Sequence, residues 1–272
     1  MPLRPILPGT LALAGTLGHN CRPPGFPVQA MSTPRQRPKP FIAGLVPTLN
    51  HRGFMSETLD RFSTEFTAYA GGCAAPVLDM GCAYGVATRA ALEQGASVHA
   101  CDMEAGHVEI LARETPEELR TRLSTSVGLL PGVDFPAGAF AAILCSRVLH
   151  FLLAAEIRRS LEKMHDWLQP GGRLFLVADT PYSGFWSAGA PAYEQRKAAG
   201  EEWPGFIEDI AVYFPDRGVI AGMLPYLNPL DPDILARECQ RAGFVVEEAA
   251  FTGRGADREG RHHAGAIARR AA

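Results

Sequence analysis

The stretch Val77-Leu78-Asp79-Met80-Gly81-Cys82-Ala83-Tyr84-Gly85 organises the chain. Its first four residues form a short apolar run that contains one acid. Gly81 and Gly85 then interrupt the run before a helix-capable segment, residues 86–94. This order predicts a buried strand, a tight loop and a helix. Glycine lets the loop backbone turn sharply near a ligand, and the unsatisfied N–H groups that begin the helix favour a polar or anionic group.

A second strand is predicted over residues 97–101, and it ends at Asp102. In a doubly wound sheet, a carboxylate at this position can accept hydrogen bonds from both hydroxyls of a ribose. The alternative for Asp102 is an exposed acid at the end of a strand. A dinucleotide site would require the pattern G-x-G-x-x-G, and of its three positions here only Gly81 is glycine, so that class of site is disfavoured.

The opening stretch resembles motif I of the class I S-adenosylmethionine (SAM) methyltransferases, with Ala83 in place of the middle glycine. Residues 98–102 resemble the second motif, and two further motifs follow in order at 134–152 and 168–177. The resemblance spans about residues 76–178. It implies an α/β fold: a doubly wound sheet of seven strands, mostly parallel with an antiparallel edge strand, and helices on both faces. The other interpretation is a similar domain that binds another nucleotide, or none.

The same resemblance implies SAM as the cofactor and places its contacts in the glycine loop and at the strand exits. The residues implied are Asp79, Gly81, Ala83, Tyr84, Gly85, Asp102, Met103, Leu129 and Ser146. Asp79 either orients the loop or the cofactor, or holds loop amides as a buried acid. Tyr84 either contacts the methionine end or packs. Many family members bind the adenine amino group with an acid where this chain has Leu129, so we expect backbone amides and apolar walls there, or Asp134.

Composition limits the classes of function. With 272 residues, 47% of them hydrophobic, the chain can bury a full core, and no apolar run is long enough to span a membrane. Beyond residue 40 there are 21 basic and 29 acidic side chains, and this acidic balance argues against a nucleic-acid partner. Six scattered cysteines without a C-x-x-C pair indicate small core residues in a reducing compartment. We therefore expect a cytoplasmic protein without membrane insertion and without a metal site.

Three regions are predicted along the chain. Residues 1–40 hold nine of the 22 prolines and no periodicity, which predicts a disordered arm, with Met31 as an alternative start. Residues 41–272 form the methyltransferase domain, and its leading helix is predicted from Met55 to Tyr69. Nine of the 23 aromatic residues fall between 180 and 230, after the fifth strand, which predicts an insertion over the carboxyl edge of the sheet. These aromatics either line an acceptor site or form a small core.

The loops after the first and second strands are assigned to the cofactor, so the exits of the fourth and fifth strands are left to face the methyl group. These two exits supply the candidates for catalysis. His150 has a near-neutral pKa suited to a general base, and its alternative role is structural, as a cover for the cofactor or a helix cap. The candidates for acceptor binding are Arg147, Tyr182, Trp186 and Trp203. We expect a SAM-dependent methyltransferase that acts on an O, N or C nucleophile of a small molecule, as a monomer or homodimer. The alternative is a non-catalytic SAM-binding protein of the same fold, acting as a sensor or partner subunit.

Overall fold

The computed structural model describes residues 35–40, 43–184, 186–214, 217–220, 222–253 and 259–272. Most of the predicted arm, residues 1–34, lies outside the described residues. A two-stranded antiparallel hairpin, β1 (Leu45–Pro47) and β2 (Phe54–Ser56), comes before the main sheet. Within the described residues, no helix has the length and apolar character needed to cross a membrane.

Seven strands form the main sheet, in the order β5-β4-β3-β6-β7-β9-β8. The parallel strands are β3 (Val77–Met80), β4 (Val98–Asp102), β5 (Leu123–Val127), β6 (Phe140–Ser146) and β7 (Leu168–Asp179). β9 (His263–Arg270) runs antiparallel to both of its neighbours, β7 and the edge strand β8 (Phe244–Phe251). The order reverses at β3, which is the position where ligands bind in open α/β sheets. The predicted fold class is confirmed.

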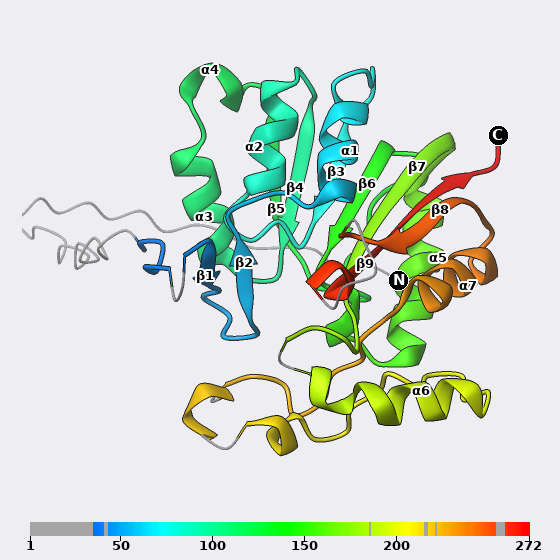
Figure 1. The fold of residues 1–272 in the computed structure, drawn as a ribbon. Coiled ribbons are helices and arrows are strands. Elements are labelled where there is room, and N and C mark those ends of the chain that lie inside the picture. The colour runs from blue at the N-terminus through cyan, green and yellow to red at the C-terminus, as the bar shows by residue number, and fades with distance from the viewer. Residues whose placement is uncertain (1–34, 41–42, 185, 215–216, 221, 254–258) are drawn as a thin grey trace, which may run out of the picture. The chain divides into compact units, whose positions relative to one another are not determined.

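Helices cover both faces of the sheet (Figure 1). α1 (Arg61–Ala70) and α2 (Val86–Glu93) pack their apolar residues on one face, against Val77, Leu144 and Phe175. α5 (Ala154–Trp167) and α7 (Pro232–Arg241) cover the other face. α3 (Ala105–Glu114) and α4 (Glu117–Arg120) connect β4 to β5.

The start of the leading helix differs from the sequence prediction. This helix begins at Arg61 rather than Met55, because Asp60 caps it by accepting a hydrogen bond from the Ser63 N–H at 3.0 Å, and residues 54–56 pair in the hairpin. β7 begins at Leu168, so the pair Gly171-Gly172 lies inside the strand.

The segment between β7 and α7 contains α6 (Ala190–Ala198) and several short 3-10 helices. It leaves the sheet at Asp179 and returns at Leu230, whose N–H donates to the Asp179 carbonyl at 2.8 Å. Figure 1 shows α6 beyond the carboxyl ends of the strands, opposite α4 at their amino ends. Residues 180–230 therefore lie at the edge where the chemistry of this fold class takes place, and we call them the cap.

Candidate functional site

The glycine loop after β3 has three residues in the left-handed region: Gly81 (φ 82°), Ala83 (φ 45°) and Gly85 (φ 76°). A Cβ on Gly81 would lie 2.3 Å from Val148 Cγ2, and one on Gly85 would lie 2.2 Å from Leu111 Cδ1. At both positions glycine is required for two reasons: the backbone is left-handed, and a Cβ would clash with a neighbouring side chain. Ala83 adopts the same conformation with a Cβ, so this position carries backbone strain.

Asp79 is 3% exposed within β3, and its Oδ2 accepts a hydrogen bond from the Thr88 hydroxyl at 2.6 Å. Thr88 lies in the first turn of α2, whose N-cap residue, Gly85, offers no side chain. Burial raises the pKa of the Asp79 carboxyl to about 6, against the opposing hydrogen bond from Thr88. Asp79 thus joins β3 to the start of α2 across the glycine loop, a geometry that matches the loop-holding interpretation.

Asp102, at the end of β4, accepts three hydrogen bonds from the protein. Its Oδ2 accepts from the Ala83 N–H at 2.8 Å, and its Oδ1 accepts from the Glu104 N–H and from His107 Nδ1, both at 2.9 Å. The residue is 5% exposed, so it is not the exposed strand-end acid of the alternative interpretation. A carboxylate offers about four lone-pair positions. One position on Oδ2 is left for a further donor, such as a ribose hydroxyl.

The N-terminal hairpin is attached to this site through two buried aromatic side chains, a feature that local sequence patterns did not predict. His107 Nε2 accepts from the Leu49 N–H at 2.9 Å, so the neutral ring carries its proton on Nδ1 and donates it to Asp102. The Tyr84 hydroxyl donates to the Pro47 carbonyl at 2.8 Å, and its ring packs edge-on against His107. Tyr84 is fully buried in this arrangement, so its ring packs between the loop and the hairpin.

Apolar side chains are exposed beside Asp102, on the side where the resemblance places adenine. Val127 and Leu129 are 57% and 44% exposed, although both are large and apolar. Val127 is paired with Asp102 in the β4–β5 register, and Met103 directly follows Asp102. Asp134, the alternative adenine contact, instead pairs with Lys163 at 3.0 Å. The geometry agrees with an apolar wall for adenine.

The exit of β6 places Ser146 and Arg147 at the carboxyl edge. Arg147 has φ 58°, and its N–H donates to the Val177 carbonyl at 2.7 Å. Its guanidinium lies 3.8 Å from the Asp60 carboxylate, and within the described part of the chain its buried Nε has no hydrogen-bond partner. A strained backbone and an unpaired buried donor are features that cluster at binding sites.

His150 does not have the geometry of a general base. It is 2% exposed, and its Nδ1 accepts from the Asp179 N–H at 3.0 Å. Burial lowers the pKa of the ring, so the imidazole is neutral and carries its proton on Nε2. No lone pair is left to accept a substrate proton, and the prediction of a catalytic role is corrected to a structural one. The ring joins the exits of β6 and β7.

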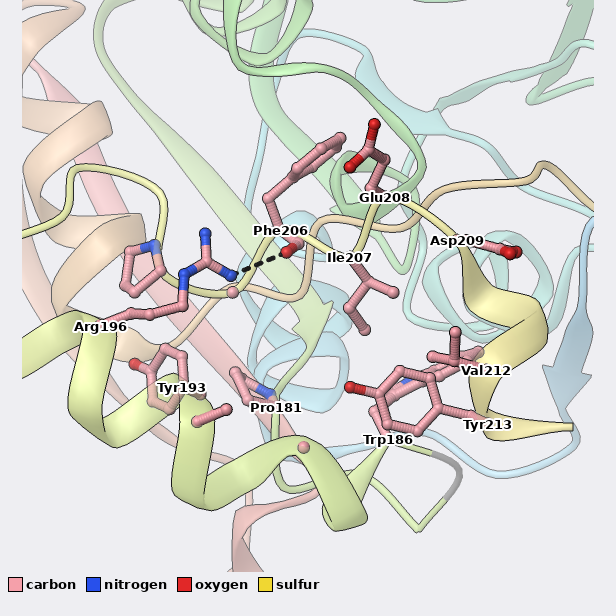
Figure 2. Close-up of a pocket in the computed structure, with 14 residues that line it drawn as sticks. Pro181, Trp186, Tyr193, Arg196, Phe206, Ile207, Glu208, Asp209, Val212 and Tyr213 are labelled. Atoms are coloured by element: carbon pink, nitrogen blue, oxygen red, sulfur yellow. Dashed lines mark hydrogen bonds between the residues drawn. The ribbon is translucent and has the colours of Figure 1, made fainter.

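The acceptor candidates of the cap separate into two groups. Trp186 is 4% exposed and packs with Ile210 and Leu227 in a small core of the cap. It also lines a cavity of about 350 Å³, together with Pro181, Tyr193, Ile207 and Tyr213 (Figure 2). Both interpretations of the cap aromatics, core and cavity wall, therefore apply to Trp186.

Trp203 and Tyr182 lie elsewhere. The guanidinium groups of Arg158 and Arg237 each lie 5.4 Å from the centroid of the Trp203 ring, and Trp203 borders a separate hollow of about 490 Å³. Tyr182 donates to Glu194, and Arg261 lies over its ring at 3.4 Å. The structure thus does not bring Trp186 and Trp203 to one cavity.

A histidine–carboxylate pair lies at the same edge, and the sequence reasoning did not assign it. His263 Nε2 lies 3.3 Å from Asp179 Oδ1. Trp186 Nε1 approaches Asp179 Oδ2 at 3.5 Å. Across the described residues, no group of three or more His, Cys, Asp or Glu side chains is arranged to hold a metal ion.

Comparison with known proteins agrees with this geometry. Residues 77–172 match a family model described as a methyltransferase domain. Residues 77–172 therefore carry a methyltransferase domain, and the strand order is that of the class I, Rossmann-like SAM-dependent methyltransferase fold. A search of curated proteins found no match.

Solved structures share the fold at low identity. A SAM-dependent methyltransferase from Mesorhizobium loti is 19% identical over 72% of this chain and 90% of its own, with a TM-score of 0.52. The 1,6-didemethyltoxoflavin-N1-methyltransferase of Burkholderia thailandensis, bound to 1,6-didemethyltoxoflavin and S-adenosylhomocysteine, is 19% identical over 78% and 80%, with a TM-score of 0.52. A Haloferax volcanii complex of the Trm112 methyltransferase activator with a methyltransferase gives 13% identity over 78% and 89%, and a TM-score of 0.54.

Proposed function

We propose that this protein binds SAM and transfers its methyl group to an O, N or C nucleophile of a small-molecule acceptor. The observation that carries the proposal is Asp102, a buried carboxylate at the end of β4 that is held by the glycine loop and keeps one acceptor position open. This carboxylate lies within the matched methyltransferase domain. We place that domain at residues 41–272, with the cap as its insertion.

The residues present fit the cofactor. Asp102 would accept from the ribose, the loop from Gly81 to Gly85 would adjoin the methionine end, and Met103 and Leu129 would border adenine. Ser146 would lie near the methyl end. SAM supplies an activated methyl group on a sulfonium, so the chain mainly has to align the acceptor and exclude water.

The cap supports a small-molecule acceptor. Its cavity of about 350 Å³ falls in the size range of ligand pockets, and it is lined by aromatic and aliphatic side chains together with Arg196, Glu208 and Asp209. The Burkholderia relative of the fold carries a small heterocycle as acceptor. Arg147 would offer its unpaired Nε to an acidic group of the acceptor. We also propose Tyr182, Trp186 and Trp203 as contacts of the acceptor. We further propose that the protein is cytoplasmic, is a monomer or homodimer, and has no nucleic-acid partner.

A non-catalytic SAM-binding role is the second candidate, and one structural observation favours it. His150, the base predicted from the sequence, is buried, and its Nδ1 already accepts the Asp179 N–H, so it offers no lone pair to an acceptor. The Haloferax complex shows this fold assembled with an activator protein. Binding of SAM without turnover of any acceptor would favour this second role.

The test is calorimetry with SAM, S-adenosylhomocysteine and NAD, together with mass spectrometry of any ligand that co-purifies. We expect SAM and its product to bind and NAD to bind hardly at all. Asp102→Asn should weaken SAM by about tenfold or more, since a hydrogen bond to a charged group contributes about 1.5–3 kcal/mol. The control is Glu118→Gln, at an exposed acid of α4. Tighter binding of NAD than of SAM would reject the proposal.

A further inference from the structure

The antiparallel direction of β9 brings an imidazole to the carboxyl edge of the sheet. β7 ends at Asp179, and the register of the two strands pairs that residue with His263, the first residue of β9. Their side chains meet, with His263 Nε2 3.3 Å from Asp179 Oδ1. The two residues are far apart in the sequence, and they come into contact because β7 and β9 pair in the sheet.

We propose that His263 is the general base that takes the proton of the acceptor, that Asp179 positions it, and that the acceptor is an aromatic hydroxyl. This inference rests on the methyl transfer proposed above and names the residue and substrate class for the same site. A base is needed when the nucleophile carries a proton at neutral pH, which is the case for a phenol.

Asp179 is built to remain ionised. Burial works to raise the pKa of its carboxyl, but the hydrogen bond from His263 and the charge of Arg147 oppose burial, and that pKa lies below its ordinary range. Its backbone N–H donates to His150 at 3.0 Å, and Trp186 Nε1 approaches Oδ2 at 3.5 Å. A fixed anion at Oδ1 favours the His263 tautomer that carries its proton on Nε2, so the lone pair is placed on Nδ1.

His263 meets the conditions that His150 fails. Its side chain is 29% exposed, whereas His150 is buried. Nδ1 of His263 has no hydrogen-bond partner among the residues that the structure describes, whereas Nδ1 of His150 accepts a backbone N–H. His150 contacts the backbone N–H of Asp179 and His263 contacts its carboxylate, and of the two rings His263 offers both a lone pair and access.

The cavity of the cap indicates the acceptor class. Trp186 approaches Asp179 through Nε1, and it also lines the cavity of about 350 Å³ in Figure 2. Tyr213, Pro181 and Ile207 are further walls of this cavity, and Arg196, Glu208 and Asp209 are its charged lining residues. Trp186 is the lining residue that also contacts Asp179. Aromatic walls prefer a flat, apolar ligand, and such a ligand would reach the His263–Asp179 pair through a polar substituent at its edge.

The proton and electrons balance without another reactant. The O–H bond of the acceptor breaks, its proton goes to His263 Nδ1, and the oxygen electron pair forms the new bond to the methyl carbon. The carbon–sulfur bond breaks with its electron pair left on sulfur, which becomes a neutral thioether. The imidazolium is stabilised by the Asp179 carboxylate and returns its proton to water.

Two variants, His263→Gln and Asp179→Asn, test the pair, with His165→Gln as a matched control. His165 is 24% exposed and lies 3.7 Å from the Asp166 carboxylate, but it lies at the end of α5, near the start of β7. NMR of protein labelled in its histidine rings should show His263 as the Nε2–H tautomer. Asp179→Asn should remove the preference for this tautomer, because the anion that holds the proton on Nε2 is lost.

Activity is measured with a panel of phenols and SAM. We expect His263→Gln to lower kcat by about a hundredfold or more, with SAM affinity by calorimetry unchanged and the acidic limb of the pH–rate profile lost. The His165 variant should behave as wild type. Wild-type turnover by His263→Gln, an Nδ1–H tautomer, or a SAM-bound enzyme that methylates no phenol would overturn the inference. Failure of the wild-type protein to bind SAM would instead overturn the proposed function, and with it the catalytic role of His263.

Discussion

Replacing Asp79 by asparagine should change how the stability of the protein depends on pH. The carboxyl is 3% exposed and lies beneath the glycine loop. Burial raises its pKa from 3.8 to about 6, and the nearby Asp102 adds to the effect. The folded state therefore holds this proton more tightly than the unfolded state does.

The sign and size follow from this difference. The contribution of Asp79 to the free energy of unfolding is full below pH 3.8 and is lost as the pH rises through about 6. One unit of pKa corresponds to about 1.36 kcal/mol, so a shift of about two units predicts a loss of about 3 kcal/mol. Asparagine has nearly the same shape and does not ionise, so the variant should not undergo this loss.

The assay is urea unfolding of both proteins between pH 4 and pH 8. The free energy of unfolding of Asp79→Asn should rise relative to wild type by about 2 kcal/mol across this range, because part of the total is already lost at pH 4. Glu118→Gln, at an exposed acid, controls for the loss of a charge. The argument from burial would be refuted if the free energies of unfolding of Asp79→Asn and wild type changed in parallel with pH. It would also be refuted if the variant became less stable relative to wild type as the pH rises.

Two further substitutions test the loop and the cap. Ala83→Gly should raise the free energy of unfolding, measured in urea, by about 0.5–1 kcal/mol, because glycine relieves the left-handed strain at φ 45°. The greater conformational entropy of glycine in the unfolded chain cancels part of this gain. Ala91→Gly, inside α2, should lower the free energy of unfolding instead. Trp186→Ala should cost about 3–5 kcal/mol by the same measurement, because the buried ring leaves a void in the core of the cap. No gain at Ala83, or a loss below 1 kcal/mol at Trp186, would contradict these two assignments.

Local patterns in the sequence were sufficient where glycines mark the ends of an element. The strand Val77–Met80 and the helix Val86–Glu93 were predicted to within one residue of their observed bounds. The N-terminal hairpin was not predicted, because its strands are only three residues long and are stabilised by contacts with distant residues. Those contacts, from Tyr84 and His107, depend on tertiary structure that no local pattern records.

The candidate cofactor residues were identifiable because they lie within, or directly after, strands that follow one another in the chain. Asp79 and Asp102 belong to β3 and β4, which are neighbours both in sequence and in the sheet. Their three-dimensional surroundings were less predictable. The sequence allowed Asp102 to be an exposed acid, whereas the structure surrounds it with three donors, one of which comes from His107.

The pairing of Asp179 with His263 has a different origin. In a parallel sheet, side chains at the carboxyl edge come from the last residues of the strands, so site residues are expected at those positions in the sequence. An antiparallel strand contributes its first residue to the same edge, because its amino end lies beside the carboxyl end of its neighbour. His263 is the first residue of β9, so an expectation based on the last residues of parallel strands does not include it. In sheets with one reversed strand, the first residue of that strand therefore belongs among the candidates for catalysis.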